Sequence, residues 1–229
     1  MSGDEVTWAR QLDGLSADHW PAFLAEHSGL PGPRADLTLV TAAALRADDD
    51  TIAALIADGG EFTAMCAAAA LGCAAGDQPH ALRARDLARD QRWRVREGVA
   101  IGLQLWGDRD PRGLTALVRA WADDPDLLVR RAAIAAICEP RLLRTPDAAA
   151  VAVDACRRAT RGLLAEDPGA RRRPDARTLR QALGYCWSVA VAADPAAGLG
   201  AFRELDDADP DVAWIVRENL KKKRLSALL

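Results

Sequence analysis

The residues best placed to do chemistry are Trp93 and Glu97, which stand four positions apart in an arginine-rich stretch. Residues four apart on a helix share one face, so the indole and the carboxylate would lie side by side. Arg92, Arg94 and Arg96 flank the pair. Tryptophan can stack on nucleic-acid bases, and an arginine fork binds carboxylates or backbone carbonyls. The spacing indicates either a binding patch or an ordinary helix face.

Aromatic residues supply a second set of candidates, because seven tryptophans accompany a single tyrosine. Trp187 stands beside Tyr185 and follows the basic segment 171–180, so we predict that this pair contacts a partner at the surface. Three other indoles are expected to fill the wide spaces between packed helices: Trp106, Trp121 and Trp214.

Cysteine and histidine give little support for metal or redox chemistry. The five cysteines are an odd number without a Cys-x-x-Cys pair and lie in alanine-rich segments, so buried reduced thiols are expected. The three histidines have no other ligand type at a metal-binding spacing. The sequence has no glycine-rich phosphate loop, nucleophile elbow or catalytic Cys/His pair. We therefore predict no metal site and no cofactor.

Positive charge is unevenly distributed over a chain whose net charge is −3. Arginines crowd residues 83–96 and 157–180, and residues 221–224 read Lys-Lys-Lys-Arg. The net charge argues against a protein that coats nucleic acid through bulk charge. The last cluster is expected to cap the final helix, where cations are favourable, with a phosphate-contacting tail as the alternative.

Hydropathy argues against a membrane protein or a secreted one. No run approaches the roughly 18 apolar residues that a membrane-spanning helix needs. The N-terminus carries Asp4, Glu5 and Arg10, where a signal peptide would have a basic start and an apolar stretch. The sequence predicts a soluble, cytoplasmic protein without a membrane partner.

Helical periodicity and a recurring motif define the expected elements. Strand signals are almost absent, while apolar residues recur at spacings of three and four, as in buried helices. The motif is an Asp followed five residues later by an aliphatic residue and Arg, with copies at Asp90, Asp124 and Asp211 and a weaker one at Asp175. Its spacing is typical of helical solenoids. We expect its charged residues to pair between adjacent units: Asp90, Asp124, Asp211, Arg96, Arg130 and Arg217.

Asp-Pro dipeptides mark the expected helix starts, because Asp caps a helix and Pro suits its first position. They occur at 110–111, 124–125, 167–168, 194–195 and 209–210. The sequence predicts helices at residues 4–13, 17–28, 34–47, 50–58, 61–75, 79–89, 92–106, 111–122, 126–138, 147–165, 175–193, 196–206 and 210–227.

The Asp, Val-Arg and alanine-rich helix pattern resembles HEAT repeats. The resemblance implies an all-α fold, a right-handed α-solenoid, or α-α superhelix, of five to six HEAT-like helix pairs. We expect one domain over residues 1–229, with an N-terminal cap at 1–30 and a C-terminal capping helix at 205–229.

The stretch 90–144 also resembles the bacterial HEAT-like alkylpurine DNA glycosylases. That family has a Trp and a catalytic Asp four residues apart, followed one repeat later by an aromatic-Val-Arg-Arg helix. By position, Trp93 matches the Trp, Glu97 the Asp, and Arg130 or Arg131 the Arg. The resemblance implies a carboxylate that stabilises positive charge on the sugar as an alkylated base departs, with arginine holding the DNA backbone.

The chain departs from that pattern at two places. Glu97 stands where the family has Asp, which moves the carboxylate by one methylene, and Leu127 and Leu128 stand where an aromatic residue is expected. A displacement of that size damages a preorganised site. Catalysis is therefore the second hypothesis, with Glu97 as the catalytic residue if the chain is a glycosylase.

The first hypothesis is a non-enzymatic, monomeric HEAT-like scaffold that binds a protein or DNA on an arginine-rich concave face. The alternative is an alkylpurine DNA glycosylase-like DNA-binding or repair protein, active or inactive. The residues expected to contact the partner are Trp93, Arg94, Arg131, Tyr185 and Trp187. Duplex DNA binding that weakens steeply with salt would favour the alternative, because neutralised phosphates release counterions.

Overall fold

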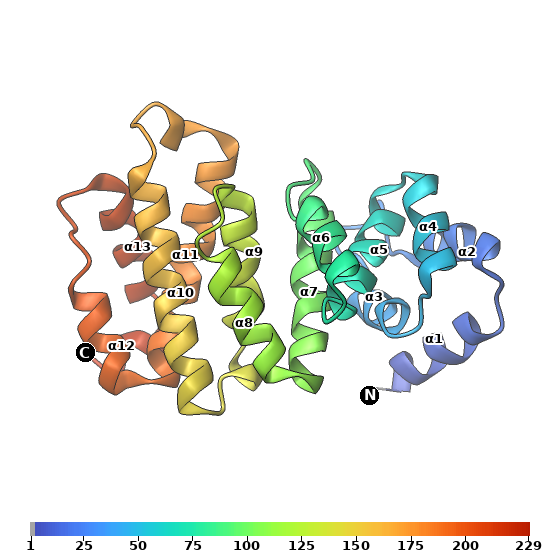
Figure 1. The fold of residues 1–229 in the computed structure, drawn as a ribbon, viewed down its shortest axis with the longest axis horizontal. Coiled ribbons are helices and arrows are strands. Elements are labelled where there is room, and N and C mark those ends of the chain that lie inside the picture. Colours follow the sequence, from blue (N-terminus) through green and yellow to red (C-terminus); the bar gives the residue numbers. More distant parts are fainter. Residues whose placement is uncertain (1–2) are drawn as a thin grey trace. The chain divides into compact units, whose positions relative to one another are not determined.

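The computed structural model describes residues 3–229, which form fourteen α-helices and three short 3-10 helices and contain no strand (Figure 1). The predicted all-α class is confirmed. The chain divides into two compact units, the first ending at Trp106 and the second beginning at Gly107. No helix within 3–229 combines the length and apolarity needed to cross a bilayer. The solenoid geometry and the single domain over 1–229 stay predictions.

The first unit is centred on α5 (Glu61–Cys73), in which every residue from Phe62 to Cys73 is buried. The other helices of this unit are α1 (Gly3–Asp13), α2 (Trp20–His27), α3 (Leu37–Ala44), α4 (Asp49–Asp58), α6 (Gln78–Leu87) and α7 (Trp93–Arg109), with a 3-10 turn η1 (Ala17–His19) before α2. Helix α5 packs against α2, α3, α4 and α6, and α3 also packs against α1. The unit therefore buries one central helix on all sides.

Helix ends in the first unit follow local capping chemistry. Asp36 accepts a hydrogen bond from the amide of Leu39 at 2.9 Å and begins α3. Asp48 accepts one from the amide of Thr51 at 2.9 Å and begins α4. Helix α4 ends at Gly59, whose φ of 75° favours a residue without a Cβ. The sequence thus sets these boundaries without help from tertiary packing.

Three glycines let the backbones of α5 and α7 approach closely. A Cβ at Gly72 of α5 would lie 2.8 Å from the carbonyl oxygen of Val99. On α7, a Cβ at Gly98 or Gly102 would come closer still to the α5 backbone, at Ala69 in the case of Gly102. The two helices therefore pack with no room for a side chain at these points.

The second unit consists of two layers of helices. Its helices are α8 (Pro111–Trp121), α9 (Leu127–Ile137), α10 (Pro146–Ala165), α11 (Pro174–Ala193), α12 (Pro195–Arg203), α13 (Pro210–Leu220) and α14 (Lys223–Ser226), with 3-10 turns η2 (Pro140–Leu142) and η3 (Ala170–Arg172). Helix α11 packs against α9 and α13, and also against α10 and α12, while α10 packs against α8 (Figure 1). We call the two sets the α9/α11/α13 layer and the α8/α10/α12 layer.

Each predicted helix has an observed counterpart, but the expected helix 17–28 consists of η1 followed by α2, and the expected helix 210–227 is divided into α13 and α14. Three Asp-Pro dipeptides cap helices as predicted, through the carboxylates of Asp110, Asp194 and Asp209. The prediction is wrong at Asp124, because Asp126 accepts the amide of Leu128 and is the cap of α9. It is also wrong at Asp167, which is followed by a turn and η3 rather than by an α-helix.

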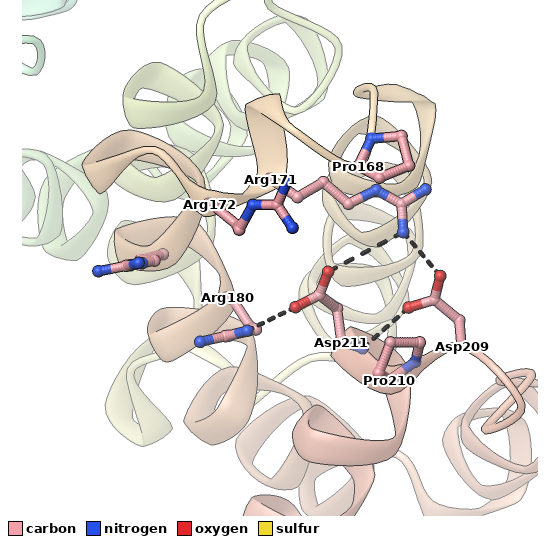
Figure 2. Close-up of a pocket in the computed structure, with 8 residues that line it drawn as sticks. Pro168, Arg171, Arg172, Arg180, Asp209, Pro210 and Asp211 are labelled. Atoms are coloured by element: carbon pink, nitrogen blue, oxygen red, sulfur yellow. Dashed lines mark hydrogen bonds and ion pairs between the residues drawn. The ribbon is translucent and has the colours of Figure 1, made fainter.

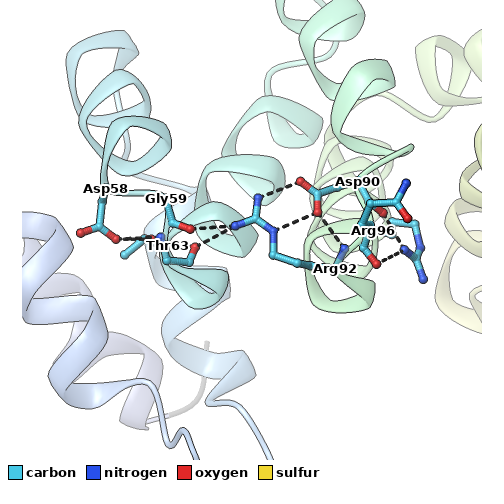
Figure 3. A network of polar contacts seen from close by, with 8 residues as sticks. Asp58, Gly59, Thr63, Asp90, Arg92 and Arg96 are labelled. Carbon is cyan, nitrogen blue, oxygen red and sulfur yellow. Dashed lines mark hydrogen bonds and ion pairs between the residues drawn. The ribbon is translucent and has the colours of Figure 1, made fainter.

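The recurring arginine binds the backbone of the loop before its own helix. Arg96 donates through Nη1 to the carbonyl oxygens of Asp90 at 2.6 Å and Gln91 at 2.9 Å (Figure 3). Arg130 repeats this arrangement, donating through Nε to the carbonyl oxygen of Asp124 at 2.6 Å and through Nη1 to that of Ala122 at 2.9 Å. The two arginines thus satisfy carbonyls of the turn before their own helix, rather than the predicted pairing with charged residues of an adjacent repeat.

Asp90 is connected through Arg92 to the loop between α4 and α5. Its carboxylate accepts hydrogen bonds from Nε of Arg92 at 2.9 Å and from Nη2 at 2.7 Å. Nη1 of Arg92 in turn donates to the carbonyl oxygen of Gly59 at 2.9 Å (Figure 3). These hydrogen bonds from Arg92 lower the pKa of Asp90, although burial opposes the shift. Asp90 therefore pairs with a residue of its own loop, and Arg92 rather than Asp90 makes the connection to the preceding loop at Gly59.

The third copy of the motif is only partly paired. Asp211 accepts a hydrogen bond from Nη1 of Arg180 on α11 at 2.5 Å. This is the pairing expected between the charged residues of adjacent repeats. Arg217, however, is exposed, and its guanidinium has no hydrogen bond or ion pair among residues 3–229. The structural pairing predicted for Arg217 is therefore wrong. Arg171 and Arg180 already occupy the carboxylates of Asp209 and Asp211 at this position.

The three tryptophans expected to fill space lie within or against the helix layers. Trp106 and Trp121 are buried, at 8% and 7% exposed. Trp214 is half-buried beneath the guanidinium of Arg180, 5.1 Å from its ring centroid, and packs over Gly184 of α11. Their predicted role as packing residues is confirmed.

His80 joins α4 to α6 through two carboxylates. Its Nε2 lies 2.7 Å from Oδ1 of Asp49, and its Nδ1 lies 2.6 Å from Oδ2 of Asp77. The hydrogen bond with Asp49 raises the pKa of His80, the bond with Asp77 adds to this, and burial opposes it. The imidazolium is therefore stabilised more in the folded chain than in the unfolded one.

The raised pKa of His80 predicts a pH-dependent stability. The stabilisation is complete below the unfolded pKa, about 6.5, and is lost as pH rises through the higher folded pKa. We expect the free energy of unfolding of the natural chain to fall as pH rises from the unfolded pKa of His80 to its folded pKa. In His80→Gln, the contribution of His80 to this decrease should be absent. Denaturant unfolding between about pH 5.5 and 8.5 measures it. His19→Gln changes an exposed histidine and serves as control; equal pH slopes in all three proteins would contradict the prediction.

Candidate functional site

A pocket of about 230 Å³ gathers the predicted residues of α7 in the first unit. It is lined by Pro33, Arg34, Ala35, Leu37, Met65, Trp93, Arg94, Glu97 and Ile101. Trp93 is 55% exposed and Leu37 is 53% exposed, so large apolar surfaces face solvent at its rim. The structure therefore brings Trp93, Arg94 and Glu97 together at one opening.

Arg94 is held in place by two neighbours. Its Nη1 donates to Oε2 of Glu61 on α5 at 2.9 Å, and its guanidinium carbon lies 4.6 Å from the centroid of the Trp93 ring. The ion pair and the stacking fix the arginine beneath the exposed indole. Arg94 thus positions Trp93 while donating to Glu61 through Nη1, and its buried Nε has no hydrogen-bond partner.

Arg131 and Tyr185 lie in the α9/α11/α13 layer of the second unit. Arg131 is half-buried on α9, and Tyr185 is 43% exposed on α11. Nη2 of Arg224 lies 3.2 Å from the Tyr185 hydroxyl, and its guanidinium carbon lies 5.0 Å from the ring centroid. Nζ of Lys222 lies 5.8 Å from the same centroid. The C-terminal basic cluster therefore folds around the one tyrosine of the chain.

Trp187 does not belong to any exposed patch, and its predicted surface role is wrong. The side chain is 0% exposed, its Nε1 donates to Oγ1 of Thr160 at 3.1 Å, and its ring packs edge-on against Phe202. Residues two apart on a helix point in nearly opposite directions, since each residue advances about 100°. Tyr185 faces outward on α11, so Trp187 faces the α8/α10/α12 layer.

A second pocket, of about 570 Å³, lies where η3 and α11 approach the start of α13 (Figure 2). We call it the arginine pocket; it is lined by Pro168, Arg171, Arg172, Arg177, Arg180, Asp209, Pro210 and Asp211. The basic segment was evident in the sequence, but its gathering with Asp209 and Asp211 was not predicted. The available signal was the third motif copy, whose Asp stands next to an Asp-Pro cap.

Ion pairs fix the inner wall of the arginine pocket. Nη1 of Arg171 lies 2.6 Å from Oδ2 of Asp209 and 3.9 Å from Oδ2 of Asp211, and Arg180 holds the other oxygen of Asp211 (Figure 2). Burial alone would raise the pKa of Asp209, but the bonds from Arg171 and from the amides of Asp211 and Val212 outweigh it, so the pKa is lowered. The carboxylate of Asp209 is therefore held ionised at neutral pH.

The cysteines have the role expected of them. All five are buried and free. Burial raises the pKa of Cys66 and of Cys156, which keeps these thiols protonated and unreactive. Among residues 3–229, no cluster of three or more His, Cys, Asp or Glu side chains could hold a metal ion.

Comparison of the chain with protein-family models, with curated proteins and with solved structures gives no match. The two pockets and the exposed face of the α9/α11/α13 layer are therefore the features of the chain that point to a function.

Proposed function

We propose that the chain is a non-enzymatic scaffold of HEAT-like helix pairs that binds nucleic acid on the exposed face of the α9/α11/α13 layer. The layered packing of the second unit supports the scaffold, because pairs of helices add to it in chain order. A solenoid stacks its helix pairs in the same manner.

The observation that carries the proposal is the exposed stripe of α11. Arg177, Gln181 and Tyr185 are all exposed and follow one another at intervals of four residues, so they share one face of the helix. They span roughly 12 Å, given a rise of 1.5 Å per residue. Lys222 and Arg224 complete the stripe at the tyrosine end. An aromatic ring flanked by cations suits a nucleic-acid strand, because bases stack on the ring while cations contact phosphates.

Binding of a fluorescently labelled oligonucleotide, measured by anisotropy over a range of salt concentrations, tests the proposal. We expect binding at low salt that weakens steeply as salt rises. Tyr185→Ala should weaken it by about tenfold, because loss of one base-stacking contact costs about 1 to 3 kcal/mol. The control is the double variant Arg112→Ala/Arg119→Ala, which removes exposed arginines of α8 in the other layer. Absence of binding at the lowest salt would overturn the nucleic-acid proposal and direct attention to a protein partner.

The Trp93 pocket favours a second candidate, a DNA glycosylase-like activity. Trp93 and Glu97 line the same pocket, as that hypothesis requires, and Arg94 holds the indole in place. Release of alkylated bases from methylated DNA, lost in Glu97→Gln, would establish the activity. DNA that is bound and left intact would support the scaffold instead.

A further inference from the structure

The arginine pocket holds more positive charge than its internal bonding uses. Four arginines line it against two aspartates. Arg171 is committed to Asp209, and it also donates to the carbonyl oxygens of Glu166 and Leu164. Arg180 is committed to Asp211 and stacks on Trp214. Two of the four guanidinium groups, those of Arg171 and Arg180, are therefore already paired with the aspartates of the pocket.

Arg172 and Arg177 are not accounted for in this way. Both are exposed, and neither guanidinium has a hydrogen bond or ion pair among residues 3–229. Figure 2 shows Arg172 at the pocket without a contact to either carboxylate. In addition, Nε of Arg180 is buried and has no acceptor. The pocket thus presents two uncompensated cations, those of Arg172 and Arg177, to whatever enters it.

We propose that the arginine pocket binds a phosphomonoester group and that, on the function proposed above, this group is the terminal phosphate of a nucleic-acid strand. A phosphomonoester carries about 1.5 to 2 negative charges at neutral pH and three strong acceptor oxygens, which matches the excess of two cations. An internal phosphodiester or a carboxylate carries one negative charge and would leave one cation without a partner. Guanidinium forks match phosphate oxygens in geometry as well as in charge.

The position of the pocket agrees with a strand end. Arg177 lines the arginine pocket and also begins the exposed α11 stripe that ends at Tyr185. A strand stacked on Tyr185 and lying along this stripe therefore reaches the pocket. The carboxylates of Asp209 and Asp211 line the same pocket, but their ion pairs with Arg171 and Arg180 offset their charge toward an incoming phosphate.

The test compares two oligonucleotides of the same sequence, one with a 5′-phosphate and one with a 5′-hydroxyl. We expect the natural chain to bind the phosphorylated strand on the order of tenfold more tightly, which is the usual effect of one or two charge-assisted hydrogen bonds. Arg172→Gln/Arg177→Gln should reduce this ratio to about one. Arg112→Gln/Arg119→Gln, the matched change on α8, should retain it. Because these side chains are exposed, all variants should keep their melting temperature within a few degrees.

A titration with inorganic phosphate, followed by chemical-shift changes of the arginine side chains, separates the two proposals. If neither oligonucleotide binds but inorganic phosphate shifts the signals of Arg172 and Arg177, the phosphomonoester site stands as a site for a small phosphorylated molecule and the nucleic-acid function fails. If both oligonucleotides bind equally and inorganic phosphate shifts neither signal, the function stands and the pocket proposal is overturned. Tighter binding of a phosphoserine peptide than of the phosphorylated strand would overturn the assignment to a strand end.

Discussion

Replacing Gly102 with alanine is expected to destabilise the first unit by about 3 kcal/mol or more, a cost at the upper end of that for overpacking a core. The added Cβ would lie within 3 Å of the carbonyl carbon of Ala69 and of the amide nitrogen of Cys73, both on the α5 backbone. Backbone atoms cannot rotate away as the end of a flexible side chain can, so the helices must move apart. Alanine gains about 1 kcal/mol of helix propensity over glycine, which is too little to offset the clash.

Denaturant unfolding of the full chain measures this effect, with Gly200→Ala as the matched control. Gly200 lies within α12, and a Cβ there would meet no atom within 4 Å. This variant should be more stable than the natural chain by about 0.5 to 1 kcal/mol, because only the propensity gain operates. A Gly102→Ala protein as stable as Gly200→Ala would show that α5 and α7 do not cross at the observed distance.

Asn219 is the second position at which we expect a large loss of stability. The side chain is 0% exposed, and it links α13 to α11. Its Oδ1 accepts a hydrogen bond from the amide of Ser188 at 2.8 Å, while Nδ2 donates to the carbonyl oxygens of Leu183 at 2.9 Å and Ile215 at 2.8 Å. Asn219→Leu keeps the number and branching of the side-chain heavy atoms, in a larger group, and removes all three bonds. We expect a loss of about 2 to 4 kcal/mol, since buried polar groups of the backbone are left without this partner.

Ser188→Ala provides a comparison at the same place in the core. The hydroxyl of Ser188 donates only to the carbonyl oxygen of Tyr185 in its own helix, so its loss should cost about 1 kcal/mol or less. Both variants are measured by thermal and denaturant unfolding. Equal losses in the two proteins would argue that the amide of Asn219 does not connect the helices.

The sequence was sufficient for elements whose boundaries depend on local chemistry. Asp110, Asp194 and Asp209 cap α8, α12 and α13 as their Asp-Pro dipeptides predict, and the apolar spacing of three and four identifies the helices between the caps. Which residues of α11 are buried and which are exposed was harder to predict. The sequence predicts a surface position for both Tyr185 and Trp187, but residues two apart on a helix cannot share a face, and the larger apolar ring takes the buried side.

The arginine pocket shows where sequence reasoning stops. Arg171 and Arg180 find their carboxylates 38 and 31 residues further along the chain, at Asp209 and Asp211. The packing of α13 on α11 decides that meeting, and no local spacing predicts it. The same applies to Lys222 and Arg224, which were expected to cap a helix end and instead surround Tyr185, 39 residues from Arg224.

The arginines that bind loop carbonyls have a consequence for how this chain tolerates sequence change. Arg96 and Arg130 recognise the backbone of residues 90–91 and 122–124, and backbone carbonyls are the same whatever side chain they carry. Substitution at an exposed loop position such as Gln91 therefore leaves the anchor intact. Insertion or deletion of a single residue moves every carbonyl out of reach. The side chains of these two loops can therefore be substituted, whereas the number of residues in each loop cannot change.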